Sequence, residues 1–136
     1  MTLPQPLVLL VEDDQDTAML YQTLLRAEGL EVVRCRGCAE AKAWLASSRR
    51  VPDLIVLDMR LPDGDGLGLC QEMLQGEFPA GDPPVMVLSA HGDPRLPSRC
   101  RQAGAKAFVD KLAGVDLMVT TAKELLQAGS SSAHRA

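Results

Sequence analysis

Strand-like and helix-like segments alternate five times along this chain, joined by short connections. The strand-like segments are short and apolar and cover residues 7–11, 31–35, 54–57, 85–88 and 107–109. The helical segments cover residues 15–28, 39–47, 67–74, 98–103 and 115–127. Because strands that alternate with helices pair in parallel, this pattern predicts an α/β fold with helices on both faces of a parallel sheet. The continuous apolar runs of the first, third and fourth strands place them at its centre.

The composition fits one soluble domain and excludes several classes of function. We expect the domain to cover residues 1–128, with a disordered tail or linker stub at 129–136, because that end has nothing to bury. Aromatic residues make up 3% of the chain and the net charge is −4, which argues against direct nucleic-acid binding. No apolar run approaches the 18 residues or so of a membrane span. Four cysteines in a well-cored chain suggest free thiols in a reducing cytoplasm.

Carboxylates stand at the ends of two of the central strands. Asp58 ends one apolar run and a Pro/Gly loop follows it, while Glu12 and Asp13 end another. The carboxyl ends of parallel strands meet at one edge, where open α/β sheets keep their sites. Like charges so close together favour a bound cation, and carboxylate oxygens favour a hard one. The sequence therefore predicts a Mg²⁺ site.

The other strand ends complete a set suited to phosphoryl transfer. Ser89 follows the fourth strand and Lys111 follows the fifth. Asp58 would be the nucleophile, and the hydroxyl of Ser89 and the ammonium of Lys111 would contact phosphoryl oxygens. Phosphoryl transfer requires mainly positioning and stabilisation of charge, which these residue types supply.

These motifs, taken in order, resemble the receiver domain of bacterial two-component response regulators. The matching segments are Val-Glu-Asp-Asp at 11–14, the run from Pro52 to Gly66, Val-Leu-Ser-Ala at 87–90 and the run from Ala103 to Lys111. The resemblance covers residues 7–127. It implies a flavodoxin-like, doubly wound sheet of five parallel strands in the order 2-1-3-4-5, with five helices.

The resemblance also implies residue roles and partners. Asp58 would be the phosphorylation site, and Mg²⁺ would be bound by Glu12, Asp13, Asp58 and the backbone carbonyl of Arg60. Ser89 and Phe108 would form the conformational switch, and Arg60 and His91 would tune hydrolysis of the acyl phosphate. The implied partners are a histidine kinase or phosphotransfer protein and a downstream output domain or target. Such a domain catalyses only its own phosphorylation and dephosphorylation, so it is not an enzyme in the metabolic sense.

Two alternative functions remain at this stage. A haloacid-dehalogenase-like phosphatase uses similar residues, but its mechanism requires a second carboxylate two residues after the nucleophile, where this chain has Arg60. A receiver-like interaction module without phosphorylation would lack a site residue, and none is missing here. Two motifs have simpler interpretations: Cys35 and Cys38 as structural thiols, and the Asp-Gly-Asp-Gly run at 63–66 as a turn.

Other expectations concern packing and backbone geometry. Thr17, Leu20, Tyr21 and Leu24 share one helical face, which predicts that they point inward. In the next helix Ala43, Trp44 and Leu45 should do so. Within the acidic run at 12–14, Asp14 should only favour the N-terminus of the following helix through the helix dipole, whereas Glu12 and Asp13 should do more. Leu112 replaces the proline common in the family after the active-site lysine. The bond before it should therefore be trans, since a cis bond before a residue other than proline costs about 2.5–4 kcal/mol.

Overall fold

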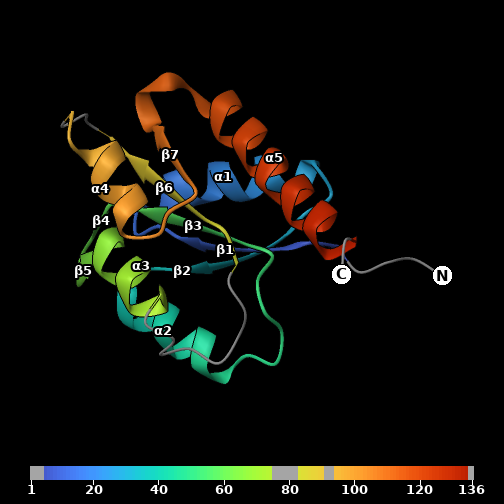
Figure 1. The fold of residues 1–136 in the computed structure, drawn as a ribbon, viewed down its shortest axis with the longest axis horizontal. Coiled ribbons are helices and arrows are strands. Elements are labelled where there is room, and N and C mark those ends of the chain that lie inside the picture. The colour runs from blue at the N-terminus through green and yellow to red at the C-terminus, as the bar shows by residue number, and fades with distance from the viewer. Residues whose placement is uncertain (1–4, 75–82, 91–93, 135–136) are drawn as a thin grey trace.

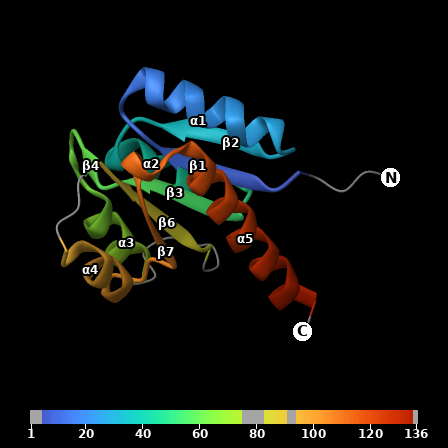
Figure 2. The same ribbon diagram turned by 90° about the horizontal axis from the view of Figure 1, so that it is seen from above.

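The computed structural model describes residues 5–74, 83–90 and 94–134, and a sheet of five parallel strands lies at its centre. The strands are β1 (Leu7–Val11), β2 (Glu31–Cys35), β3 (Leu54–Asp58), β6 (Val85–Ser89) and β7 (Ala107–Asp110). Figure 2 shows them in the order β2-β1-β3-β6-β7, and every neighbouring pair is parallel. Numbered by themselves, these five strands have the predicted order 2-1-3-4-5, so the fold class is confirmed.

Five α-helices cover the two faces of this sheet. They are α1 (Gln15–Ala27), α2 (Cys38–Ser47), α3 (Gly66–Leu74), α4 (Leu96–Gln102) and α5 (Val115–His134). One core cluster joins α2, α3 and α4 to alternate strand residues such as Leu9 and Ile55. The second core cluster joins α1 and α5 to the strand residues that point to the opposite face, such as Leu10 and Val56. Figure 1 shows α5 on one side of the sheet and α2 and α3 on the other. Both faces are therefore buried, which explains the continuous apolar runs.

The inward face of α1 differs from the prediction. Ala18, Tyr21 and Leu25 are buried there, whereas Leu20 is 47% exposed. Only Tyr21 among the four predicted residues is fully inside. In α2, Ala43 is likewise exposed and Trp44 is half-buried, while Ala41 and Leu45 are inside. In both helices the buried face includes an alanine, Ala18 in α1 and Ala41 in α2, and a pattern of large apolar side chains does not reveal such a position.

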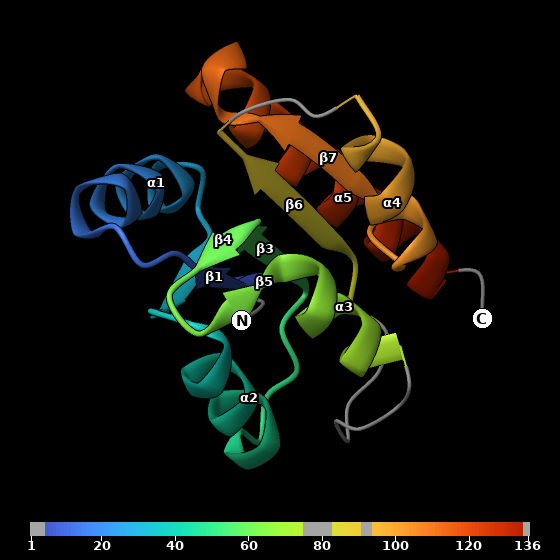
Figure 3. The ribbon, with the colours of Figure 1, turned by 90° about the vertical axis from the view of Figure 1, so that its left-hand side faces the viewer.

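The loop after Asp58 contains a short antiparallel ribbon that the sequence did not indicate. Its strands are β4 (Arg60–Leu61) and β5 (Gly64–Asp65), which pair with each other. The predicted turn at 63–66 overlaps this ribbon, and Gly64 has a φ of 155°, a conformation that side chains rarely adopt. Figure 3 faces the carboxyl ends of the main strands and shows the ribbon lying there. The loop that follows Asp58 is thus an ordered element beside the predicted site.

Two helix ends also lie outside their predicted bounds. Helix α4 begins at Leu96, two residues before the predicted start. Helix α5 continues to His134 and passes residue 128, where we expected a disordered tail. Adding turns to an existing helix costs less than starting one, so α5 continues through the alanines at 128 and 133 and the glycine and serines between them. None of the helices in the described ranges is long and apolar enough to cross a membrane.

The Lys111–Leu112 bond is trans, as predicted. The segment forms a short 3₁₀ helix, η1 (Lys111–Ala113), and the carboxylate of Asp110 accepts a hydrogen bond of 2.8 Å from the backbone N–H of Leu112. Proline has no N–H and could not make this contact. Gly114 follows with a φ of 102° and redirects the chain into α5.

Candidate functional site at the carboxyl edge of the sheet

The three acidic residues that follow β1 lie in different surroundings. Asp14 caps α1, because its Oδ2 accepts hydrogen bonds from the backbone N–H (2.9 Å) and the hydroxyl (2.6 Å) of Thr17. Glu12 is buried, with 1% of its surface exposed. Asp13 is exposed. Asp14 thus lies at the N-terminus of α1, as predicted, and its capping hydrogen bonds are an addition to the predicted dipole effect.

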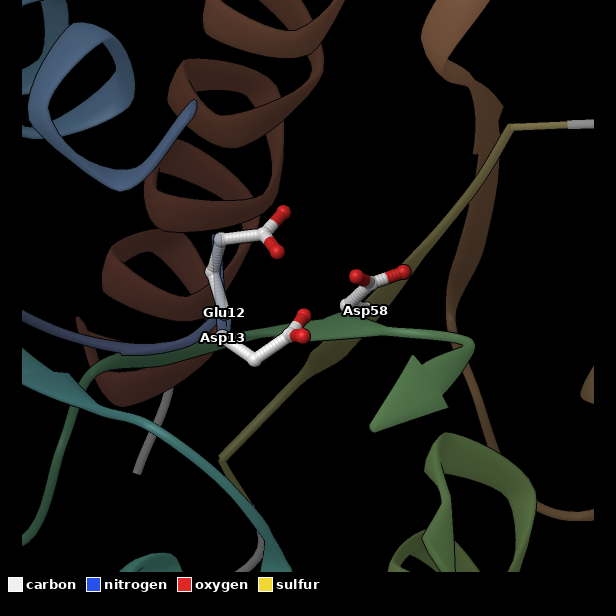
Figure 4. A group of neighbouring side chains, drawn as sticks. All are labelled: Glu12, Asp13 and Asp58. Carbon is white, nitrogen blue, oxygen red and sulfur yellow. The ribbon is translucent and has the colours of Figure 1, made fainter. Parts of the chain in front are cut away.

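Asp58 joins Glu12 and Asp13 in one cluster. It is the last residue of β3, and the pairing of β1 with β3 brings the ends of these strands together. One carboxylate oxygen from each of the three residues lies within 4.8 Å of the others, and Figure 4 shows the three side chains side by side. Within the described residues, no other group of three acidic, histidine or cysteine side chains converges in this way. The convergence predicted from the strand ends is present.

Lys111 supplies the positive charge in this cluster. Its Nζ lies 2.7 Å from Oε1 of Glu12 and 3.1 Å from Oδ2 of Asp58. Burial lowers the pKa of Lys111, but the hydrogen bond to Glu12 and the charge of Asp58 outweigh it, so the pKa is raised overall. The ammonium therefore stays charged and neutralises part of the cluster.

Glu12 holds its proton more tightly than an ordinary glutamate. Burial raises its pKa from 4.5 to about 7, against the opposing effect of the hydrogen bond from Lys111. The charge of Asp58 adds to the rise. The metal-free cluster thus carries a carboxylate whose ionisation is costly near neutral pH, and an added cation would offset that cost.

The donor set and its spacing fit a small hard cation. Mg²⁺ binds oxygen at about 2.0–2.1 Å, so oxygens on opposite sides of the ion lie about 4.2 Å apart. Carboxylate oxygens that all lie within 4.8 Å of one another are near enough to contact one such ion. Carboxylate oxygens without histidine or cysteine favour Mg²⁺ over zinc. Glu12, Asp13 and Asp58 are therefore suited to hold Mg²⁺.

The remaining predicted site residues lie on neighbouring elements. Ser89 ends β6 and is buried, and Phe108 is half-buried on β7. Arg60 begins β4, and its backbone N–H donates to Oδ1 of Asp58 at 3.3 Å. The roles of these three in phosphate binding, switching and metal binding stay predictions. His91 lies outside the described residues.

Two contacts that support the site were missed by sequence reasoning. Arg34 on β2 donates to the backbone carbonyls of Glu12 and Asp13. Asp63, between β4 and β5, accepts hydrogen bonds of 2.7 and 2.9 Å from the first two N–H groups of α2. The only signal for the first was an arginine between apolar residues near the end of a strand. Gly37, which caps α2 without a side chain, was the only signal for the second.

The cysteines form no second site. All four are free and buried, and burial raises the pKa of each thiol. Cys35 and Cys38 belong to the core cluster under α2. Their placement agrees with the prediction of structural thiols.

Relatives among curated proteins are regulators. The chain is 33% identical over 119 residues to the polar-differentiation response regulator DivK of Brucella anthropi. The aligned region covers 88% of this chain and 94% of that protein. It is 33% identical over 108 residues to the KDP operon transcriptional regulatory protein KdpE of Escherichia coli, covering 79% of this chain and 45% of that protein. It therefore spans less than half of the latter's length.

Solved structures show the same fold. The signal receiver domain of a putative Luxo repressor protein from Vibrio parahaemolyticus superposes with a TM-score of 0.83 at 29% identity, covering 94% of this chain and 95% of that one. The receiver domain of a signal transduction histidine kinase from Syntrophus aciditrophicus gives 0.78 at 31% identity, covering 90% and 91%. The family model of the response regulator receiver domain matches residues 8–123. These matches give the phosphatase alternative no support. The chain belongs to the receiver domains of two-component response regulators.

Proposed function

We propose that Asp58 accepts a phosphoryl group from a histidine kinase or a phosphotransfer protein, and that Mg²⁺ is the cofactor. The observation that carries this proposal is the cluster itself. A buried strand-end carboxylate lies 3.1 Å from the Lys111 ammonium and within 4.8 Å of two further carboxylates. A nucleophile, a cation site and a fixed positive charge are thus together at one edge of the sheet.

The reaction makes and breaks one bond to phosphorus. An oxygen of Asp58 attacks the phosphorus, the bond to the donor's imidazole nitrogen breaks, and the imidazole takes a proton from solvent. The product is an acyl phosphate on Asp58, which water later cleaves to inorganic phosphate. When bound, Mg²⁺ supplies charge neutralisation between the carboxylate and the phosphoryl oxygens. Lys111 provides a second positive charge, and Ser89 at the end of β6 provides a hydroxyl donor.

The domain acts in signalling rather than in metabolism. Its chemistry ends with its own acyl phosphate, so we infer a phosphoacceptor and not an enzyme with an external substrate. Ser89 and Phe108, which lie on the adjacent strands β6 and β7, would couple the phosphorylated site to the α4–β7–α5 surface. That surface would contact an output domain or a target protein. The four free cysteines are typical of a reducing compartment, which favours the cytoplasm.

The boundary of the unit is part of this proposal. Residues 1–128 would form the receiver, and residues 129–136 would be a tail or a linker stub that begins as the end of α5. Its relatives differ in this respect, because the chain covers 94% of DivK but 45% of KdpE. Both a single-domain regulator and the receiver of a longer chain fit the site.

Incubation with acetyl phosphate, followed by intact-mass measurement, tests the assignment. The wild type should gain one phosphoryl group in Mg²⁺ and none in EDTA, and Asp58→Asn should gain none. Asp16→Asn changes an exposed carboxylate in the first turn of α1 and serves as the matched control, which should label like the wild type. Labelling that persists in Asp58→Asn would refute the assignment. A wild type that binds Mg²⁺ without labelling would favour the interaction module.

A further inference from the structure

One arginine on β2 holds the main chain of both acidic residues that follow β1. Nε of Arg34 donates to the carbonyl of Glu12 and Nη2 donates to the carbonyl of Asp13, each at 3.1 Å. The guanidinium is a planar fork of fixed geometry, so two donors to consecutive carbonyls fix the orientation of both peptide groups. The backbone N–H of Glu12 is also bound to β2, through the carbonyl of Cys35 at 3.0 Å.

This contact lies just beyond the last paired residues of β1. The pairing of β1 with β2 ends at Val11 and Cys35, and the pairing of β1 with β3 also ends at Val11. Glu12 and Asp13 therefore follow the last paired residue of their strand. The three carboxylates of the cluster repel one another, and that repulsion favours rotation of the two peptide groups away from Asp58. Arg34 opposes this rotation from the side of the main chain.

We propose that Arg34 is a positioning residue that holds Glu12 and Asp13 in the arrangement that binds Mg²⁺. Among the described residues, its hydrogen bonds reach the main-chain carbonyls of Glu12 and Asp13 and none reaches a carboxylate of the cluster. Its effect on phosphorylation passes through the geometry of the Glu12–Asp13 turn. This inference rests on the proposed function, because it assumes that the acidic cluster is a Mg²⁺ site.

A simple charge effect predicts the opposite result. Arg34 places a positive charge near a cation site, so its removal should tighten Mg²⁺ binding if Coulomb repulsion alone decided the affinity. If positioning decides, removal should weaken binding. Partners that orient metal ligands typically contribute 10–100-fold to affinity, and we expect about 10-fold here, since the contact is to the main chain.

The experiment compares three variants with the wild type. Arg34→Met removes the fork and the charge, and Arg34→Lys keeps the charge without the paired donors. Arg36→Met removes an equal charge from an exposed position two residues away. Mg²⁺ affinity is measured by calorimetry on the unphosphorylated protein, and the phosphorylation rate is measured over a range of Mg²⁺ concentrations. Urea unfolding in EDTA establishes that each variant is folded.

Positioning predicts a distinct set of results. Arg34→Met should bind Mg²⁺ about 10-fold more weakly and need correspondingly more Mg²⁺ for half-maximal phosphorylation, while its rate at saturating Mg²⁺ recovers. Arg34→Lys should also bind Mg²⁺ more weakly than the wild type. The Mg²⁺ affinity of Arg36→Met should equal that of the wild type. Unchanged or tighter binding in Arg34→Met overturns the inference, as does full rescue by Arg34→Lys. If the wild type itself neither binds Mg²⁺ nor labels, the proposed function has failed instead.

Discussion

Raising the pH from 5 to 8 in metal-free buffer should destabilise this protein, because Glu12 is buried. In the unfolded chain Glu12 loses its proton near its ordinary pKa of 4.5, whereas burial raises the pKa to about 7 in the folded state. Between these values the folded state binds more protons than the unfolded state, so the free energy of unfolding falls as pH rises. The contribution is fully favourable below pH 4.5 and is lost by about pH 7.

The size of this loss follows from the difference between the two pKa values. A tenfold change in proton affinity corresponds to about 1.4 kcal/mol, so a rise from 4.5 to about 7 corresponds to about 3 kcal/mol. Lys111 does not share this pH range, because its pKa is raised from 10.5. The stability that its ion pairs contribute is present below pH 10.5 and is lost only above that value.

Urea unfolding, followed by circular dichroism between pH 5 and 8 in EDTA, measures the loss. The matched variant is Glu12→Gln, which keeps the shape of the side chain and removes its titration. The wild type should lose about 2.5 kcal/mol more than the variant between pH 5 and pH 8, slightly less than the full difference because part of it is already lost below pH 5. Other titrating groups, the two histidines included, are common to both. A wild-type profile parallel to that of the variant would refute the role of Glu12.

Mg²⁺ provides a second test of the same reasoning. The cation binds the ionised carboxylate, so protons and Mg²⁺ compete for Glu12. The stabilisation that 10 mM Mg²⁺ provides should therefore grow from pH 5 to pH 8. A free concentration about 100 times the dissociation constant would contribute about 2.7 kcal/mol. An increment that is the same at both ends would contradict the competition.

Further predictions concern the core, a helix cap and the thiols. Leu57→Ala should cost about 2–5 kcal/mol of unfolding free energy, because Leu57 is fully buried, whereas Leu20→Ala should cost about 0.5 kcal/mol or less; equal losses would contradict the observed burial. Gly37→Ala should lower the melting temperature, since its Cβ would lie 2.6 Å from Oδ1 of Asp63, and the effect should shrink in an Asp63→Ala background; an unchanged effect would exclude the clash. At pH 8 the four buried cysteines should react slowly with a thiol reagent when folded and quickly in urea; fast reaction of the folded protein would show that the core opens readily.

The predictable part of the site follows from the strand ends. Parallel order places Asp58, Glu12, Ser89 and Lys111 at one edge, and each residue is visible in the sequence as the polar end of an apolar run. The fold class and the convergence of three carboxylates could therefore be predicted. What the sequence could not indicate was how deeply each acid is buried, because Glu12 and Asp13 are neighbours with opposite exposure.

The unpredictable part consists of contacts between distant segments. Arg34 reaches Glu12 across 22 residues, and Asp63 reaches Cys38 across 25. Neither contact has a local sequence pattern, since each depends on how two segments that are distant in the sequence meet at the sheet edge. The error in α1 has a different cause. Tyr21 has helical spacing both to Thr17 and Leu24 and to Ala18 and Leu25, so periodicity fits either face. Only packing against α5 and the sheet decides between them.

The two basic residues of the site differ in what they contact, and this difference leads to a last prediction. Arg34 contacts the main chain, whereas Lys111 contacts two of the carboxylates that Mg²⁺ would use. Lys111 thus stabilises the metal-free cluster and competes with the cation. Lys111→Met should lower metal-free stability by up to about 3–5 kcal/mol, the usual cost of breaking a buried pair, with proton uptake by Glu12 absorbing part of it. The same variant should gain more stability from Mg²⁺ than the wild type gains, although it phosphorylates more slowly. Paired melting curves in EDTA and in Mg²⁺ measure both effects, and an equal or smaller gain in the variant would show that Lys111 and the cation do not compete for the same oxygens.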